Sequence, residues 1–153
     1  LEEGVGKMKA ALEGRSDNSL IITARTSAFS VTNDEDALVR AKAYEAAGVD
    51  ALFFAGISTR AQIELLNASI SIPIFIAPKG NEVMDLTYLA DKGVKICLQS
   101  HQPFSASVQA IYTTLKALRE GTTPSNIKSI ASNELMKEVT RSEEYERLTK
   151  DYL

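Results

Sequence analysis

Cysteine, histidine and tryptophan are scarce in this chain. Its 153 residues include one cysteine, one histidine and no tryptophan. A single cysteine excludes an internal disulfide, which predicts a reducing, cytoplasmic setting. Cys97 lies inside the apolar run Val94–Leu98. We interpret it as a small core residue and not as a nucleophile, because free cysteines are among the most buried residue types.

Long apolar runs and a strong net charge are also missing. No apolar stretch approaches the roughly 20 residues needed to span a bilayer, and the formal net charge is -3. We therefore expect neither a membrane partner nor a nucleic-acid partner. The start, Leu1–Gly4, lacks the pattern of a signal peptide. A hydrophobic content of 44% and a charged content of 24% predict one globular domain.

Four short apolar runs predict β-strands. They lie at Ser19–Ala24, Ala51–Ala55, Ile72–Ala77 and Val94–Leu98. None of them alternates between apolar and polar residues, which is typical of parallel strands that are covered on both faces.

Helical segments are expected around and between these runs. A helix precedes the first strand, and others are predicted at 33–47, 58–67, 82–92 and 103–120. Thr32 and Glu35 form a possible capping box, Ser58 a possible N-cap, and Gly48 a helix end. Alternating strands and helices predict an α/β fold of four βα units. Such units occur in an open doubly wound sheet or in half of an eight-stranded barrel, and periodicity does not separate these two.

A turn-rich break at Gly121–Ser125 divides the chain. We expect a βα domain over residues 1–121 and a C-terminal helical extension over residues 122–153. The extension is polar with a patchy apolar face, which predicts packing on a neighbouring subunit. That face consists of Leu135, Met136, Val139, Tyr145, Leu148 and Tyr152.

Candidate ligand-binding residues follow the predicted strands. They are Arg25, Thr26 and Ser27 after the first strand, Gly56 after the second, Lys79 after the third, and Gln99, His101 and Gln102 after the fourth. The carboxyl ends of parallel strands meet at one edge of the sheet, where α/β proteins bind ligands.

Arg25 is the most informative of these residues. Its planar guanidinium suits a carboxylate or phosphate, and a surface salt bridge that closes the strand is the alternative. His101 is interpreted as a ligand contact or as a structural loop residue, and Lys79 most simply as solvated. The set suits a small polyanionic acid. It lacks the carboxylates that a hard divalent cation needs, so no metal site is expected in this chain.

Three segments, Lys7–Ala11, Ile22–Thr26 and Arg40–Ala51, resemble the isocitrate lyase and phosphoenolpyruvate mutase superfamily. The C-terminal portion is similar to its oxaloacetate decarboxylase branch. The segments that carry this second resemblance are Gln99–Phe104, Val108–Tyr112, Leu115–Gly121, Leu135–Lys137 and Val139–Arg141.

The resemblance implies that residues 1–121 are the C-terminal half of a (β/α)8 TIM barrel. It implies a lyase that decarboxylates oxaloacetate, a small keto acid, to pyruvate and CO2 through an enolate. Arg25 and His101 would be catalytic, and Thr26, Ser27, Gly56, Gln99 and Gln102 would bind substrate with them. Mg²⁺ (or Mn²⁺) would be held by residues outside this chain. The enzyme would be a homo-oligomer, a dimer or a tetramer, assembled through the C-terminal helices.

The chain departs from the superfamily at two positions. Ser27 stands where an aspartate is common, and Ala55 where an acidic residue is common. Both differences argue against an isocitrate or methylisocitrate lyase. Another carbon–carbon lyase, or a carboxyphosphonate or phosphonate mutase, remains an alternative, as does a catalytically incomplete fragment or assembly module.

Overall fold

The computed structural model describes residues 1–153 and divides them into two units, residues 1–101 and 102–153. The first unit contains a four-stranded parallel sheet in the order β1-β2-β3-β4. The strands are β1 (Thr23–Thr26), β2 (Ala51–Ile57), β3 (Ile74–Pro78) and β4 (Val94–Cys97). The predicted α/β fold of four parallel strands is confirmed.

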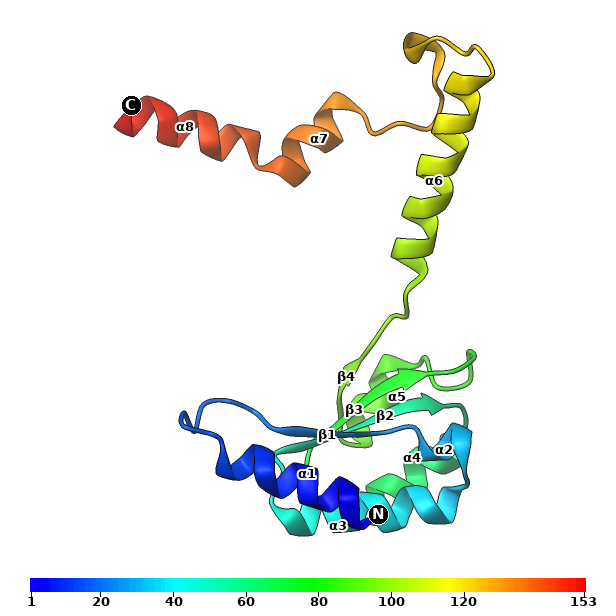
Figure 1. The fold of residues 1–153 in the computed structure, drawn as a ribbon, viewed down its shortest axis with the longest axis vertical. Helices are drawn as coiled ribbons and strands as arrows, with labels where there is room; N and C mark the ends of the chain where they lie inside the picture. Colours follow the sequence, from blue (N-terminus) through cyan, green and yellow to red (C-terminus); the bar gives the residue numbers. More distant parts are fainter. The chain divides into compact units, whose positions relative to one another are not determined.

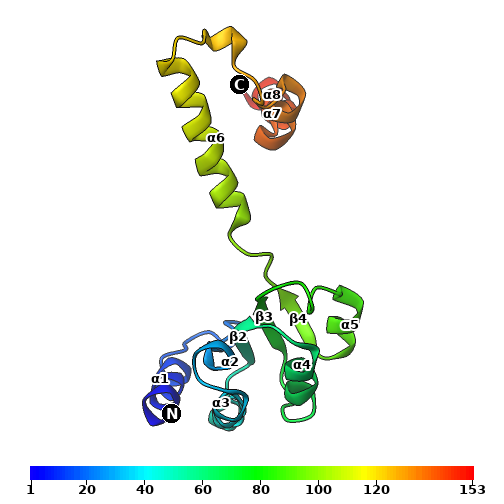
Figure 2. The same cartoon turned by 90° about the vertical axis from the view of Figure 1, so that its right-hand side faces the viewer.

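Helices cover one face of this sheet. They are α1 (Glu2–Glu13), α2 (Ala28–Val31), α3 (Asp34–Ala47), α4 (Arg60–Asn67) and α5 (Leu86–Asp91). Figures 1 and 2 show α1, α3 and α4 side by side on the same face. A doubly wound sheet reverses its strand order and has helices on both faces. Strands in unbroken chain order with helices on one face are typical of part of a (β/α)8 barrel.

The core lies between the sheet and these helices. Alternate strand residues such as Leu52, Phe54 and Ile76 are buried there with Ile63 and Leu66 of α4. Side chains between them in the sequence point to the opposite face. The first unit places no helix on that opposite face.

The first strand begins later than the sequence predicts. Leu20 and Ile21 are 56% and 58% exposed and precede the strand. Parallel pairing with β2 starts only at Thr23, which lies opposite Ala51. It continues to Thr26, so Arg25 lies within β1 and not after it. The start of the predicted strand Ser19–Ala24 is therefore wrong, because an apolar run does not reveal where its neighbour begins.

The predicted capping box of Thr32 and Glu35 is also wrong. Asn33 is the N-cap of α3, and its side-chain oxygen accepts a hydrogen bond from the backbone N–H of Asp36 at 2.8 Å. The Thr32 hydroxyl instead donates to the Asp36 carboxylate at 2.8 Å. Likewise, α4 takes Thr59 as its N-cap, one residue after the predicted Ser58.

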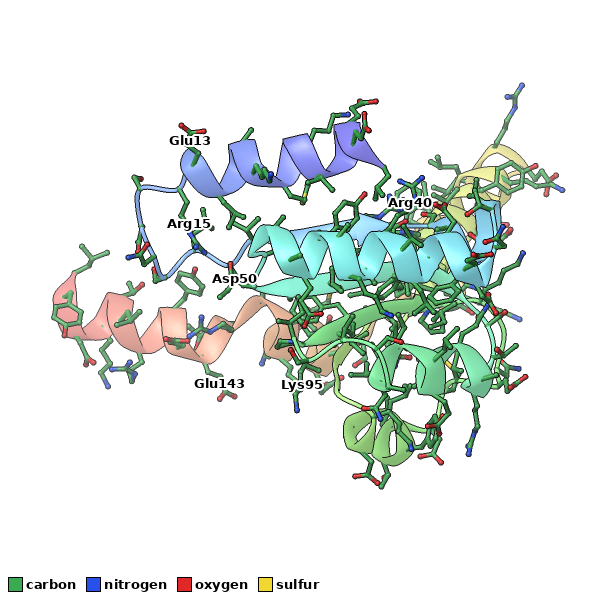
Figure 3. The ribbon with its side chains drawn as sticks, turned by 90° about the horizontal axis from the view of Figure 1, so that it is seen from below. Glu13, Arg15, Arg40, Asp50, Lys95 and Glu143 are labelled. Atoms are coloured by element: carbon green, nitrogen blue, oxygen red, sulfur yellow. The ribbon has the colours of Figure 1, made fainter.

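An ion pair ties the amino ends of the first two strands together. Nη1 of Arg15 donates to Oδ2 of Asp50 at 2.7 Å, and the backbone N–H of Ile22 donates to the same oxygen at 2.7 Å. Arg15 also donates to the carbonyl of Leu20. Figure 3 shows Arg15 and Asp50 pointing toward one another. The pair therefore holds the loop between α1 and β1 against the start of β2.

The second unit is helical. It consists of α6 (Gln102–Arg119), a short 3-10 helix (Pro124–Asn126), α7 (Asn133–Thr140) and α8 (Ser142–Tyr152). None of these helices contains a buried residue. The structure thus groups α6 with the C-terminal helices, whereas the sequence predicts a boundary at 121/122. No helix of the chain has the length and apolar character required to cross a membrane.

Replacing Asp50 with alanine should destabilise the first unit. The Arg15 and Asp50 side chains are only 18% and 31% exposed, so the change leaves a half-buried guanidinium and the Ile22 N–H without their acceptor. We expect the free energy of unfolding in urea to fall by about 1–3 kcal/mol. The control Glu3→Ala removes the exposed Glu3–Lys7 pair and should cost less than about 1 kcal/mol. Equal losses of stability in both variants would contradict the structural role of the Arg15–Asp50 ion pair.

Candidate functional site

Arg25 lies at the carboxyl edge of the sheet, on the face that the helices leave bare. It stands in register with Phe53 of β2, Phe75 of β3 and Ile96 of β4. Its guanidinium carbon is 5.6 Å from the centre of the Phe53 ring, a cation–π distance. Arg25 is exposed and makes no salt bridge and no side-chain hydrogen bond. The alternative interpretation of Arg25, a surface salt bridge that closes the strand, is therefore not what the structure shows. The positive charge of Arg25 is available to an anion.

Thr26 and Ser27 connect Arg25 to the short helix α2. The Thr26 hydroxyl accepts a hydrogen bond from the backbone N–H of Ala28 at 3.2 Å. The Ser27 carbonyl accepts the N–H groups of Ser30 and Val31, which closes the turn of α2. The Ser27 hydroxyl itself makes no hydrogen bond. Both hydroxyls therefore keep an unused donor, and only that of Ser27 has no hydrogen-bond partner at all.

Gly56 is required by packing at the end of β2. Its φ is +82°, and a Cβ at this position would lie 2.7 Å from Oγ and 2.9 Å from Cβ of Ser30 in α2. The ring of Phe29 also packs on Phe54, with the ring centroids 5.5 Å apart. The missing side chain therefore lets α2 pack closely on β2. A contact between Gly56 and substrate stays a prediction.

No hydrogen bond or ion pair joins Arg25 to the remaining strand-end residues of the first unit, Lys79, Gln99 and His101. The backbone N–H of Lys79 donates to the Ile57 carbonyl at 2.7 Å, and its side chain is exposed. Gln99 and His101 are exposed and make no side-chain hydrogen bond. His101 ends the first unit, and Gln102 begins α6 in the second. Their predicted roles in substrate binding are not tested by these positions.

A pocket of about 180 Å³ lies beside Thr26 and Ser27. Asp36 and Arg40 also line it, and Nε of Arg40 donates to the Asp36 carboxylate at 2.9 Å. This bond, together with that from the Thr32 hydroxyl, holds the pKa of Asp36 below its usual value. Because the two charges neutralise each other, this pocket offers little attraction to an anion. Arg25 does not line it.

The chain contains no cluster of potential metal ligands. No three side chains of the His, Cys, Asp and Glu types come together to hold a metal ion. Burial raises the pKa of the Cys97 thiol, which disfavours the thiolate form that acts as a nucleophile. The interpretation of Cys97 as a core residue is in keeping with its packing against the core cluster.

Two features of the site were not predicted from sequence. One is the row of Phe53, Phe75 and Ile96 beside Arg25, because the continuous apolar runs do not tell which side chains face which way. The other is Gln62, the one buried polar side chain of the chain, which contacts Asp34 at the start of α3. The spacing Thr59–Gln62 is a sequence signal for a capping box, yet nothing in the sequence indicates the contact with Asp34.

The comparisons with known proteins agree with this architecture. A family model described as phosphoenolpyruvate phosphomutase matches residues 1–119. A protein of Bradyrhizobium sp. (strain ORS 278) named oxaloacetate decarboxylase is 48% identical over 153 residues, which are 100% of this chain and 53% of that protein. A protein of the same name from Bradyrhizobium diazoefficiens is 51% identical over 144 residues, 94% of this chain and 50% of that protein. The chain spans about half the length of these curated relatives.

Solved structures of similar fold are more distant in sequence. A phosphonopyruvate hydrolase in complex with oxalate and Mg²⁺ has a TM-score of 0.75 at 24% identity and covers 99% of this chain and 56% of its own. A 2,3-dimethylmalate lyase has a TM-score of 0.75 at 18% identity, with coverages of 97% and 54%. These likenesses bear on the fold alone, and they identify it as part of a (β/α)8 barrel.

Replacing Gly56 with alanine should displace α2 and destabilise the first unit. The variant combines a left-handed backbone with a clash against Ser30. Gly80→Ala is a matched control, because Gly80 has a similar φ of +87° but open space around its Cβ position. We expect a loss of about 1 kcal/mol for the control and about 1–3 kcal/mol more for Gly56→Ala in urea unfolding. Equal losses would show that Ser30 does not restrict this position.

Proposed function

Because the chain belongs to the phosphoenolpyruvate phosphomutase family, we propose that it forms the substrate-binding half of an oxaloacetate decarboxylase. The enzyme would be a (β/α)8 barrel, with the four βα units of this chain as its C-terminal half. The names of the curated relatives support this activity. The observation that carries the proposal is Arg25, a guanidinium without a carboxylate partner at the carboxyl edge of the sheet.

The reaction needs positive charge where Arg25 lies. Oxaloacetate carries two carboxylates and a keto group, and loss of CO2 leaves the enolate of pyruvate. Groups that stabilise the growing negative charge on the enolate oxygen lower the barrier. Arg25 binds the carboxylate that remains and faces the enolate oxygen. In the closed barrel that we propose, the neighbouring apolar row of Phe53 and Phe75 would strengthen this attraction, because apolar surroundings screen charges less than water does.

The other strand-end residues take supporting roles in this proposal. His101 orients the departing carboxylate or delivers a proton to the enolate carbon, with help from Gln99 or Gln102. Thr26, Ser27 and Gly56 contact the substrate at the ends of β1 and β2. The unpartnered Ser27 hydroxyl supports the role of that residue as a hydrogen-bond donor.

A divalent metal does not fit the residues of this chain. Mg²⁺ and Mn²⁺ take oxygen ligands, with carboxylates of the protein completed by water and substrate, and the chain gathers no three candidate ligands. We therefore propose that the Mg²⁺ (or Mn²⁺) ligands lie outside these residues. The phosphonopyruvate hydrolase structure, which contains Mg²⁺ and oxalate, supports the presence of a metal in barrels of this fold.

Replacing Arg25 with alanine in the complete protein should abolish most of the activity. Without the guanidinium, the carboxylate and the enolate lose their main cationic partner in this half. We expect kcat/KM for oxaloacetate, measured by pyruvate release, to fall roughly 100- to 1,000-fold. Arg119→Ala is the matched control, because Arg119 also lacks a carboxylate partner but lies near the end of α6. Unchanged turnover of oxaloacetate by Arg25→Ala would refute the proposal. If the wild-type protein turned over a hydroxy diacid or a phosphonate faster than oxaloacetate, that result would favour another lyase or a mutase.

We also propose that the C-terminal helices join copies of the protein into a homo-oligomer, a dimer or a tetramer. The apolar face predicted on the extension is exposed, with Leu135, Met136, Val139, Tyr145 and Tyr152 at 47% to 78%. One face of α6 also carries an exposed apolar stripe, at spacings of three and four residues. Its members are Phe104, Val108, Ile111, Leu115 and Leu118, which are 38% to 71% exposed. Stripes of this kind pack on another helix or sheet.

The cytoplasmic location expected from the single cysteine stays a prediction.

Replacing Leu115 with lysine should weaken this assembly. A charge that association would bury within the stripe opposes association. We expect sedimentation equilibrium to show a shift toward the monomer for Leu115→Lys. Lys116→Gln changes the charge of the adjacent side chain off the stripe and should keep the wild-type mass. A wild-type protein that is monomeric at all concentrations would refute the proposed oligomer.

A further inference from the structure

Gln62 links two strand-end loops through a buried amide. The residue lies in the first turn of α4 and is 8% exposed. Its Nε2 donates to Oδ1 of Asp34, the first residue of α3, at 2.8 Å. Its Oε1 accepts the backbone N–H groups of Ser58 at 2.9 Å and of Thr59 at 3.3 Å.

Helix capping explains only half of these contacts. In the capping box of α4, the side chain at this position needs to be an acceptor, which glutamate supplies as well as glutamine. The donor group of the amide is used on Asp34 alone. A glutamate would place a carboxylate against the Asp34 carboxylate, and a reversed amide would turn its N–H groups toward the N–H groups of Ser58 and Thr59. Only an amide in this orientation satisfies both loops.

The two loops that Gln62 joins leave adjacent strands. On one side, Asp34 follows α2, the short helix that begins directly after Arg25, Thr26 and Ser27. On the other side, Ser58 follows Gly56 and Ile57 at the end of β2. Between them, α2 packs on β2 through the Ser30–Gly56 and Phe29–Phe54 contacts. The hydrogen bonds of Gln62 therefore hold the C-terminal side of α2, through Asp34, against the loop that follows β2. The N-terminal side of α2 continues directly from Arg25–Ser27.

From this arrangement we propose that Gln62 is a positioning residue for the reaction. By holding α3 against the loop between β2 and α4, it fixes α2 and thereby the backbone of Arg25–Ser27 relative to Gly56. This inference rests on the proposed decarboxylation at Arg25. Gln62 itself touches no substrate, and it acts through Asp34 and α2.

The first experiment exchanges the donor and the acceptor across the bridge. Gln62→Glu alone sets two carboxylates against each other. In the double variant Gln62→Glu/Asp34→Asn, the new amide on α3 donates to the new carboxylate on α4, which still accepts the two backbone N–H groups. In the complete protein, we expect Gln62→Glu to lower kcat for oxaloacetate by roughly 10- to 100-fold with a smaller change in KM. The double variant should recover to within about threefold of wild type.

The control is Gln109→Glu, the same chemical change on the exposed face of α6, where the amide contacts only Thr113. It should keep the wild-type kcat. All variants are compared at a temperature at which circular dichroism shows them to be folded. Wild-type kcat in Gln62→Glu, or a double variant no better than the single one, would overturn the proposal.

The second experiment does not depend on activity. Amide hydrogen exchange in the full chain reports on the N–H groups of Ser30 and Val31, which bond to the Ser27 carbonyl. We expect Gln62→Glu to speed their exchange roughly tenfold, while the core amides of Ile63 and Leu66 keep their protection. A complete wild-type protein without activity on oxaloacetate would refute the proposed function. The exchange rates at Ser30 and Val31 would then still test whether Gln62 holds α2 in place. Unchanged exchange at Ser30 and Val31 would overturn the role of Gln62.

Discussion

Parallel pairing of consecutive strands is the constraint on which the first unit depends. Each strand lies beside the next one in the chain, so every connection must return from the carboxyl edge to the amino edge. A right-handed crossover does this through a helix, and strands in unbroken order place all these helices on one face. Two consequences follow together. The residues that leave each strand gather at one edge, and the opposite face, with Arg25, Phe53 and Phe75, stays bare.

Local sequence patterns predict most of the elements but not their limits. The four apolar runs correspond to the four strands, because strands of parallel sheets carry apolar residues on both faces. In the first unit, however, helices cover only one of the two faces that the sequence predicts to be covered (Figures 1 and 2). Leu20 and Ile21 extend the first run in sequence but lie outside the strand, since pairing depends on where the distant Ala51 begins β2. The helix α2 was not predicted, because its four residues are too few to show a helical period.

The candidate site was predictable to the extent that it follows from strand ends. Arg25 stands out because a charged residue ends an apolar run, but only the structure shows that no carboxylate neutralises it. The hydrogen bond between Gln62 and Asp34 joins residues 28 positions apart. In the sequence, the capping box with Thr59 is already a sufficient reason for a glutamine at this position, so nothing points to Asp34. Long-range polar contacts of this kind leave no periodic signal, so one sequence does not reveal them. The register of Phe53 with Phe75 is hidden for the same reason.

The charges at the carboxyl edge favour the proposed division of the substrate and metal sites between the two halves of the barrel. Three of the carboxylates that lie near this edge are already engaged. Asp34 accepts from Gln62, Asp36 pairs with Arg40, and Glu82 accepts the backbone N–H of Arg60. Arg25 makes no ion pair, and its exposure leaves the positive charge available to an anionic ligand.

A carboxylate placed beside Arg25 to hold a cation would neutralise the guanidinium and cancel its attraction for substrate. A metal ion close to Arg25 would in turn be repelled unless additional acids surrounded it. In a closed barrel, the two demands are compatible when the arginine projects from one half and the acidic ligands project from the other, with the substrate between them. The open carboxyl edge of these four strands supplies the first of those two surfaces.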